Sequence, residues 1–292
     1  MIDRKIVVAV IKGAITFIPG ANYFLNIKRK KTRHSGANAL FSYSLWLTNL
    51  VYFVEQKIQP DFSRLAEIGN GGSLGIAFCA FLTGTKKYFS FEYRDNIDFQ
   101  EQIELLEKIS LFFDKSEPIH YFEKINIKVT DYSFPEQIVL PKEQRTKLLQ
   151  LLKLDLQNKL VGSELIILVN NWEVQNPLNI SFVFSRAVME HVKSPLAIYK
   201  ALKIHMNEDA LMLHDIEFHS HGITSMHGDH RKISFWLWFI IFGKRPFYLN
   251  RLNMFGHIHL IANSGFLILK SDERFIGNSH LSFGGVIVGK RQ

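Results

Sequence analysis

The pattern of apolar and polar positions predicts alternating strands and helices after residue 60. Short apolar runs indicate strands, and apolar residues at helical spacing indicate the helices between them. Strands separated by helices pair in parallel through right-handed crossovers. The expected strands are 64–68, 87–93, 165–169, 180–185, 210–218, 266–270 and 284–288, and the expected helices are 74–82, 100–113, 144–154, 195–205 and one within 248–264.

The two ends of the chain depart from this alternation. Residues 271–283 join the last two strands without a helical pattern, so we expect the final strand to run antiparallel. Residues 1–60 are predicted to form a helical, basic cap or arm, with a helix at 37–58. Residues 61–292 are predicted to form one α/β domain with insertions near 114–160 and 219–250.

Composition and charge narrow the class of protein. Hydrophobic residues make up 47% of the 292 residues, which is enough for a large core. The single cysteine, Cys79, excludes an internal disulfide and a cysteine-based zinc site and favours an intracellular protein. The net charge is +8, and residues 1–60 hold nine Lys or Arg against two acidic residues. This excess suits a phosphate-rich partner such as anionic lipid, and a solvated basic loop explains it equally well.

Two apolar stretches, residues 6–18 and 233–242, are too short to span a bilayer, which takes about 20 apolar residues. The first is predicted to be a helix at a membrane interface or a helix packed on the main domain. The aromatic residues 235–242 are predicted to be a lid over an acceptor, a patch that meets lipid, or ordinary packing.

The sharpest motif is a glycine-rich turn between the first strand and its helix. Its sequence is Glu67-Ile-Gly-Asn-Gly-Gly-Ser-Leu-Gly75. Glycines let the backbone approach a ligand, and the helix start offers N–H donors. Glu92 follows Gly69 by 23 residues and ends the next strand, where a carboxylate can accept both hydroxyls of a ribose. The turn therefore predicts a ligand that contains a nucleoside.

This turn resembles the first motif of class I S-adenosylmethionine-dependent methyltransferases, in the type 11-like branch. Residues 180–192, which end in Val-Met-Glu-His-Val, and residues 201–213 resemble later motifs, so the likeness spans roughly 64–290. Ser73 stands where many members have a third glycine, and Ser181 replaces the usual acid. The resemblance implies a seven-stranded, mostly parallel sheet with helices on both faces and an antiparallel final strand.

The resemblance also implies an activity and a set of cofactor-binding residues. The cofactor would be S-adenosyl-L-methionine, and a methyl group would pass to an oxygen or nitrogen of a small-molecule or glycan-like acceptor in the cytoplasm. Glu92 would hold the ribose, and the other residues would surround the methionine and adenine parts. The implied cofactor-binding residues are Glu67, Gly69, Gly71, Ser73, Leu74, Glu92, Asn171, Trp172, Ser185, Arg186 and Ala187.

A dense polar cluster, residues 214–221, begins in the fifth strand and runs beyond its end. Ligands of such sheets bind at the carboxyl edge, so this cluster is predicted to meet the acceptor, or to be a polar rim without chemistry. A divalent metal held by Asp, Glu and His is a third alternative, but the spacing matches no specific metal motif, and no metal is predicted. The candidate catalytic residues are His191, Asp215 and His219, and the candidate substrate-binding residues are Glu217, His221, Arg245, Tyr248 and Arg251.

Two other functions remain open. A NAD(P)-dependent oxidoreductase is disfavoured because Ser73-Leu74 stands where a dinucleotide fingerprint expects x-x-Gly, with glycine at the position of Leu74. A catalytically inactive member of the fold could act as a binding protein at the membrane surface, through residues 1–34. No nucleic-acid partner is expected, because no Asp/Asn-Pro-Pro-Tyr/Phe signature follows the fourth strand.

Overall fold

The computed structural model describes residues 3–20, 38–92, 97–123, 125, 127–170, 176–225, 228–244, 248–275 and 282–292. Within them the helices are α1 (Arg4–Ile15), α3 (Ala39–Glu55), α4 (Gly75–Leu82), α5 (Phe99–Asp114), α6 (Lys142–Gln157), α7 (Pro195–His205), α8 (Phe235–Phe242) and α9 (Met254–Asn263). The strands are β1 (Arg64–Ile68), β2 (Lys87–Phe91), β3 (Ile166–Val169), β4 (Ile180–Arg186), β5 (Met206–Glu217), β6 (Phe266–Phe275) and β7 (Ser282–Arg291).

The strands form one sheet in the order β3-β2-β1-β4-β5-β7-β6. β1 pairs in parallel with β2 and β4, β2 with β3, and β4 with β5. β7 lies antiparallel to both β5 and β6, so β6 runs in the direction of the first five strands. These pairings confirm the predicted fold class, a mostly parallel α/β sheet with an antiparallel final strand.

The register brings the carboxyl ends of the central strands level with one another. Ile68 of β1 pairs with Phe91 of β2 on one side and with Ser185 of β4 on the other. Ser185 in turn pairs with His214 of β5. Residues that follow these four strands therefore meet at one edge of the sheet, where ligands of open α/β sheets bind.

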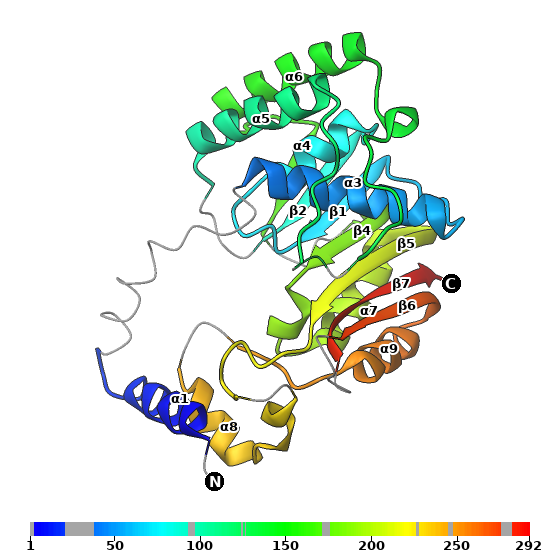
Figure 1. Ribbon diagram of the computed structural model, residues 1–292. Helices are drawn as coiled ribbons and strands as arrows, with labels where there is room; N and C mark the ends of the chain where they lie inside the picture. The colour runs from blue at the N-terminus through cyan, green and yellow to red at the C-terminus, as the bar shows by residue number, and fades with distance from the viewer. Residues whose placement is uncertain are drawn as a thin grey trace.

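Helices cover both faces of the sheet (Figure 1). α3, α4, α5 and α6 pack together on one face, and α7 and α9 pack together on the other. Successive side chains of a strand point to opposite faces. Leu65 accordingly faces the core under α3–α6, and Ala66 faces the core under α7 and α9. Two buried faces explain why these strands appear in the sequence as continuous apolar runs.

α3 lies in the same core as α4 and α5. Twelve of its 17 residues are buried, so it is a core helix and not an amphipathic surface helix. Trp46 donates a 2.8 Å hydrogen bond from Nε1 to Thr83 Oγ1, and Tyr43 donates to the carbonyl oxygen of Glu117. The domain boundary that we placed at residue 60 stays a prediction.

Three strands are longer than the hydrophobic pattern predicted. β5 begins at Met206 and not at residue 210, through polar residues that include Asp209 with φ 62°. β6 and β7 extend to Phe275 and Arg291 because backbone hydrogen bonds pair them along their whole length. β6 alternates buried or half-buried residues with exposed ones, and apolar patterning does not detect such an edge ribbon.

α1 and α8 form a separate pair on the side of the sheet where β4 and β5 end (Figure 1). Their backbones touch at Gly13, where a Cβ atom would lie 2.0 Å from the carbonyl oxygen of Ile240. At Gly243 a Cβ atom would lie 2.1 Å from Thr16 Oγ1. α1 thus packs on the aromatic helix of the insertion. Among the described residues, no helix has the length and apolar character needed to cross a membrane.

Gly285 tests how tightly the C-terminal ribbon is packed. A Cβ atom there would lie 2.3 Å from Met254 Cε and 2.7 Å from the carbonyl oxygen of Asp272, which cannot move without distorting β6. Gly285→Val is expected to lower the free energy of unfolding by roughly 1–3 kcal/mol in urea denaturation. Lys290→Ala on the same strand is the control. It removes only the surface ion pair of Lys290 with Asp209, and such a pair contributes about 0–1 kcal/mol. Equal losses in the two variants would contradict the packing.

Candidate active site

The glycine-rich turn leaves β1 at Ile68 and enters α4 at Gly75. Gly69 and Gly71 have φ values of 71° and 64°, in the left-handed region that glycine adopts without strain. A Cβ atom at Gly69 would lie 2.6 Å from Cγ2 of Val188, which follows β4. The motif therefore needs glycine at residue 69 for two reasons: the positive φ of its backbone, and the close approach of the Val188 side chain.

Side chains from neighbouring elements fix the turn. Asn70 donates from Nδ2 to Ser90 Oγ at 2.7 Å, and its Oδ1 accepts from the Gly72 N–H at 2.9 Å. Gln102 of α5 accepts from the Leu74 N–H at 2.8 Å and donates to the Gly72 carbonyl at 3.3 Å. We did not predict Gln102, because no local pattern links a residue of α5 to a turn 28 positions earlier.

Glu92 lies directly after β2 and points to the turn. Its Oε2 accepts a 2.8 Å hydrogen bond from the Gly71 N–H. The predicted ribose-binding carboxylate and the predicted glycine-rich turn are therefore in contact. The side chain is half-buried, so it is within reach of a ligand that occupies the turn.

Glu67 is the penultimate residue of β1, just before the turn, and is 7% exposed. Burial raises the pKa of its carboxyl group to about 8, against the hydrogen bond that the Tyr88 hydroxyl donates to Oε2. Glu67 is thus protonated at neutral pH in the folded protein. Ser73 and Leu74 are also buried, and the Ser73 hydroxyl accepts from the Gly75 N–H at 3.3 Å.

The end of β4 contributes Ser185, Arg186 and Ala187. Ser185 is fully buried, and its Oγ lies 2.7 Å from Nδ1 of His214. Ala187 adopts φ 52° and donates from its N–H to the carbonyl oxygen of Asp215 at 2.9 Å. These contacts join the ends of β4 and β5 and bend the chain away from the sheet.

Arg186 pairs with the acids of β5. Its Nε lies 3.4 Å from Asp215 Oδ2, and a terminal nitrogen lies 3.9 Å from Glu217 Oε1. The guanidinium also lies 5.0 Å from the ring centre of Phe41. Asp215 is 1% exposed, so this candidate base is buried against a cation.

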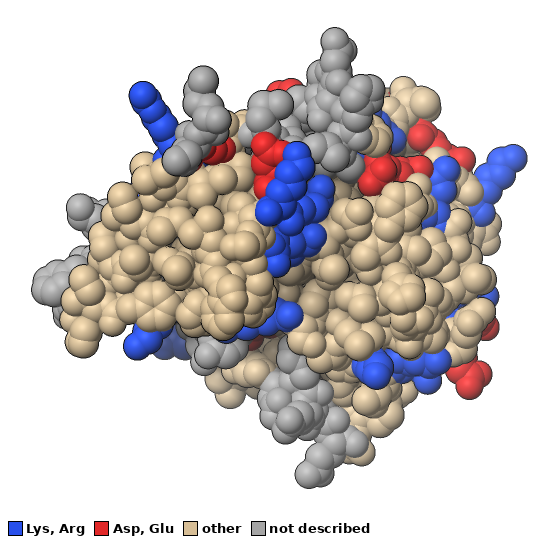
Figure 2. Space-filling model, turned by 90° about the horizontal axis from the view of Figure 1, so that it is seen from below, with Lys and Arg blue, Asp and Glu red and all other residues tan. Residues whose placement is uncertain are grey.

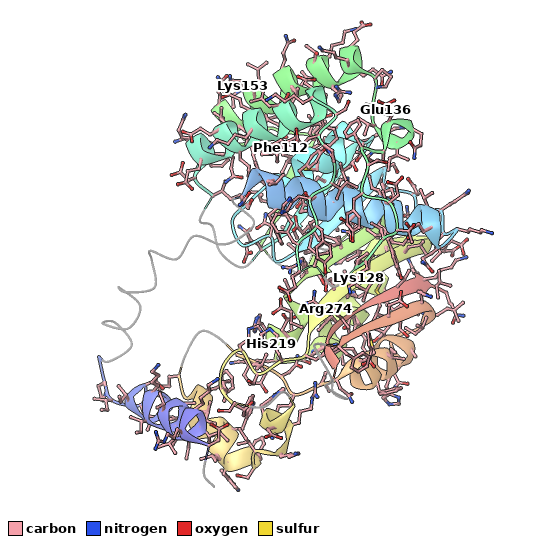
Figure 3. The ribbon with its side chains drawn as sticks, in the orientation of Figure 1. Phe112, Lys128, Glu136, Lys153, His219 and Arg274 are labelled. Carbon is pink, nitrogen blue, oxygen red and sulfur yellow. The ribbon has the colours of Figure 1, made fainter. Side chains whose placement is uncertain are left out.

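The histidines beyond β5 form an ordered cluster. His219 Nε2 lies 2.8 Å from Glu217 Oε2, and its Nδ1 accepts from the His221 N–H at 3.0 Å. The rings of His219 and His221 stack with centroids 4.1 Å apart. Burial opposes ionisation of Glu217, but the bond from His219 and the charge of Arg186 outweigh it and lower its pKa to about 2. Figure 3 shows His219 beyond the sheet, on the side of α1 and α8.

His191 and Glu190 lie in a short 3-10 helix after β4. His191 Nδ1 lies 2.7 Å from the carbonyl oxygen of Tyr248, and burial lowers the pKa of the ring. Glu190 is 2% exposed, and burial raises the pKa of its carboxyl group well above the usual value. We did not predict a role for Glu190, although it stands beside His191 in the motif.

The segment after α8 connects the 3-10 helix of Glu190 and His191 to the α1–α8 pair. Asn250 donates from Nδ2 to the Met189 carbonyl and from its backbone N–H to the Glu190 carbonyl, both at 2.7 Å. Arg251 donates to the Ile233 carbonyl and lies 5.4 Å from the ring centre of Trp238. Arg251 therefore holds α8 in place. The predicted residues Asn171, Trp172 and Arg245 lie outside the described residues.

No family model and no curated relative matches the sequence. Similar solved structures are S-adenosylmethionine-dependent methyltransferases. One from Mesorhizobium loti is 7% identical and covers 82% of this chain and 95% of its own, with a TM-score of 0.43. One from Methanosarcina mazei is 13% identical, with coverages of 82% and 96% and a TM-score of 0.43.

A third is magnesium protoporphyrin IX methyltransferase from Synechocystis with bound S-adenosylhomocysteine, at 9% identity, coverages of 86% and 84%, and a TM-score of 0.42. Likeness at these identities and TM-scores does not transfer an activity to this chain.

Glu67 gives the site a testable pH dependence. Its folded-state pKa of about 8 lies above the value of 4.5 expected in the unfolded chain. The unfolded state therefore releases this proton first, and the stability that the protonated form provides is lost between pH 4.5 and pH 8. Glu67→Gln removes this loss.

In urea denaturation, the stability of Glu67→Gln relative to wild type is expected to rise by roughly 3 kcal/mol between pH 5 and pH 8. Glu104→Gln, at an exposed position on α5, is the control and is expected to show no such change. A constant difference between Glu67→Gln and wild type would mean that Glu67 is ionised in the folded protein.

Proposed function

We propose that this protein is an S-adenosylmethionine-dependent methyltransferase. The observation that carries the proposal is the contact between Glu92 and Gly71, which joins the carboxylate proposed to bind the ribose to the glycine-rich turn at the edge of a parallel sheet. The fold and the order of the motifs along the chain support the same activity. The acceptor is proposed to be an oxygen or nitrogen of a small-molecule or glycan-like compound.

The residues present fit the cofactor. Gly71 presents no side chain in the turn, and Glu92 beside it offers a carboxylate for the ribose. The cofactor, when bound, supplies a methyl group on a sulfonium that is its own leaving group. The protein then has to align the acceptor with that methyl group and exclude water.

Among the three candidate bases, the contacts favour His191. The Tyr248 carbonyl can only accept a hydrogen bond, so His191 carries its proton on Nδ1 and has a lone pair on Nε2. Its lowered pKa keeps the ring neutral at pH 7. His219 uses both ring nitrogens in hydrogen bonds, and Asp215 is buried against Arg186. His191 Nε2 is therefore proposed to take the proton of the acceptor.

Cofactor binding separates this function from the alternatives. Glu92→Gln keeps the shape of the side chain but removes the charge that accepts ribose hydroxyls, which is expected to weaken S-adenosylhomocysteine binding at least roughly tenfold in calorimetry. Glu101→Gln, at an exposed position on α5, is the control and is expected to bind as wild type does.

Binding of NAD in place of S-adenosylhomocysteine would identify an oxidoreductase and refute the proposal. Tight S-adenosylhomocysteine binding without methyl transfer to any acceptor in a cell extract would instead support the inactive binding protein.

A second feature favours a location at a membrane surface. Six apolar side chains of residues 4–18 and three of α8 are strongly exposed, and Trp236 reaches 75%. An exposed group of this many apolar side chains is typical of a surface that binds a membrane or another protein. The exposed residues are Val7, Val8, Ile11, Ile15, Phe17, Ile18, Phe235, Trp236 and Phe239.

The charges around this surface match an anionic bilayer. α1 and α8 contain no acidic residue, whereas Arg4, Lys5 and Lys12 lie on α1 and Lys244 follows α8. Asp3, at the start of α1, accepts hydrogen bonds from Ser225. Figure 2 shows a wide surface without charged side chains over this part of the molecule, with Lys and Arg at its edges. We propose that α1 and α8 lie in the headgroup region of anionic lipid.

Vesicle sedimentation tests this location. Wild type is expected to sediment with phosphatidylglycerol vesicles, and the double variant Ile11→Ser, Trp236→Ser is expected to lose roughly tenfold or more in partition, because each side chain transfers apolar area out of water. Val161→Ser is the control, since Val161 is 83% exposed outside this surface. Unchanged sedimentation of the double variant would show that α1 and α8 do not touch lipid.

A further inference from the structure

Glu190 is a buried carboxyl group whose oxygens lack hydrogen bonds among the described residues. It is 2% exposed, and neither Oε1 nor Oε2 makes a hydrogen bond within the described part of the chain. A buried carboxyl group in this state is costly unless a cation or a donor compensates it. The proposed methyl transfer leaves Glu190 without a role, so its position calls for a separate explanation.

Two histidines converge on Glu190 from different strand ends. His191 Nε2 lies 3.9 Å from Glu190 Oε1, and the rings of His191 and His221 have centroids 4.9 Å apart. One side-chain ligand atom from each of Glu190, His191 and His221 lies within 4.8 Å of the other two. Around a tetrahedral ion with bonds of about 2 Å, such atoms lie roughly 3.4 Å apart, so a small contraction would close the site.

The hydrogen bonds prepare His191 as a ligand. Its Nδ1–H donates to the Tyr248 carbonyl at 2.7 Å, which leaves the lone pair of Nε2 on the side of Glu190. Metal-binding histidines in proteins usually donate their second ring N–H to a carbonyl or carboxylate in this way.

His219 is a positioning residue and not a ligand. Its Nδ1 accepts from the backbone N–H of His221, so the ring proton lies on Nε2 and is donated to Glu217 Oε2. This arrangement holds Glu217 Oε2 3.7 Å from His221 Nε2. Glu217 therefore offers a carboxylate as fourth ligand on the His221 side, where it forms a second group with His219 and His221.

The surroundings of the cluster also favour a cation. Three acidic side chains, those of Glu190, Asp215 and Glu217, lie near one guanidinium, that of Arg186. A bound cation would therefore find more acidic neighbours than basic ones.

We propose that Glu190, His191 and His221, with Glu217 as fourth ligand, bind one divalent transition-metal ion. Two imidazoles and two carboxylates suit Zn²⁺, Mn²⁺ or Fe²⁺ and suit Ca²⁺ poorly, since that ion prefers a shell of oxygens. The site binds the ion without any cofactor, so it depends on neither the glycine-rich turn nor Glu92. It does bear on the proposed base: with an ion bound, His191 Nε2 is a ligand, so His191 acts as the base only in the metal-free protein.

Calorimetry on the full chain after treatment with a chelator tests the site, with ZnCl₂ and MnCl₂ as probes and no cofactor present. Wild type is expected to bind one ion per chain. Glu190→Gln and His221→Gln are expected to weaken binding at least about tenfold, because each removes a ligand. Glu190→Gln keeps the shape of the buried side chain, so loss of folding is not expected to obscure the result, and circular dichroism checks it.

His259→Gln is the matched control. His259 is an exposed histidine on α9 that contacts Asn263 at 2.8 Å, so it reports on adventitious binding by surface imidazoles. Equal weakening by His259→Gln and His221→Gln would overturn the proposal, as would the absence of any binding to wild type. X-ray absorption of the zinc-loaded protein is expected to show two imidazoles, and a shell without them would also overturn it.

Discussion

Backbone hydrogen bonds hold β1, β2, β4 and β5 in parallel register, so that Ile68, Phe91, Ser185 and His214 end in one row. Most candidate groups of the site lie in the last residues of these strands or directly after them. The glycine-rich turn follows β1, Glu92 follows β2, Glu190 and His191 follow β4, and the histidine cluster follows β5. A slip of one residue in any of these pairings would turn the strand's side chains to the opposite face and separate these groups.

The edge of the sheet concentrates ionisable groups in a poorly solvated place, and their partners decide which of them carry charge. Glu67 is protonated, because burial raises its pKa to about 8. Glu217 is ionised, because His219 and Arg186 outweigh the effect of its burial. Burial outweighs the charge of Arg186 at Glu190 and raises its pKa well above the usual value. Glu67 and Glu190 therefore differ in charge state from the ionised Glu217.

The site and the α1–α8 pair are mechanically connected. The segment that leaves α8 supplies the carbonyl of Tyr248 to His191 and clamps the Met189 and Glu190 carbonyls through Asn250. Arg251, in the same segment, binds the Ile233 carbonyl and covers Trp238. A helix pair that rests on lipid would thus lie one short segment away from the proposed acceptor site, so an acceptor that partitions into lipid could reach the site from the membrane side.

The sequence by itself determined the alternation of strands and helices, the antiparallel end of the sheet, and the glycine-rich turn with Glu92. Those features depend on local spacing, because side-chain periodicity and glycine content act within a few residues. Tertiary structure alone decided the contacts of Gln102 with the turn, the packing of α1 on α8, and the meeting of Glu190, His191 and His221. These contacts join segments far apart in the chain, and only the register of the sheet and the path of its connections bring them together.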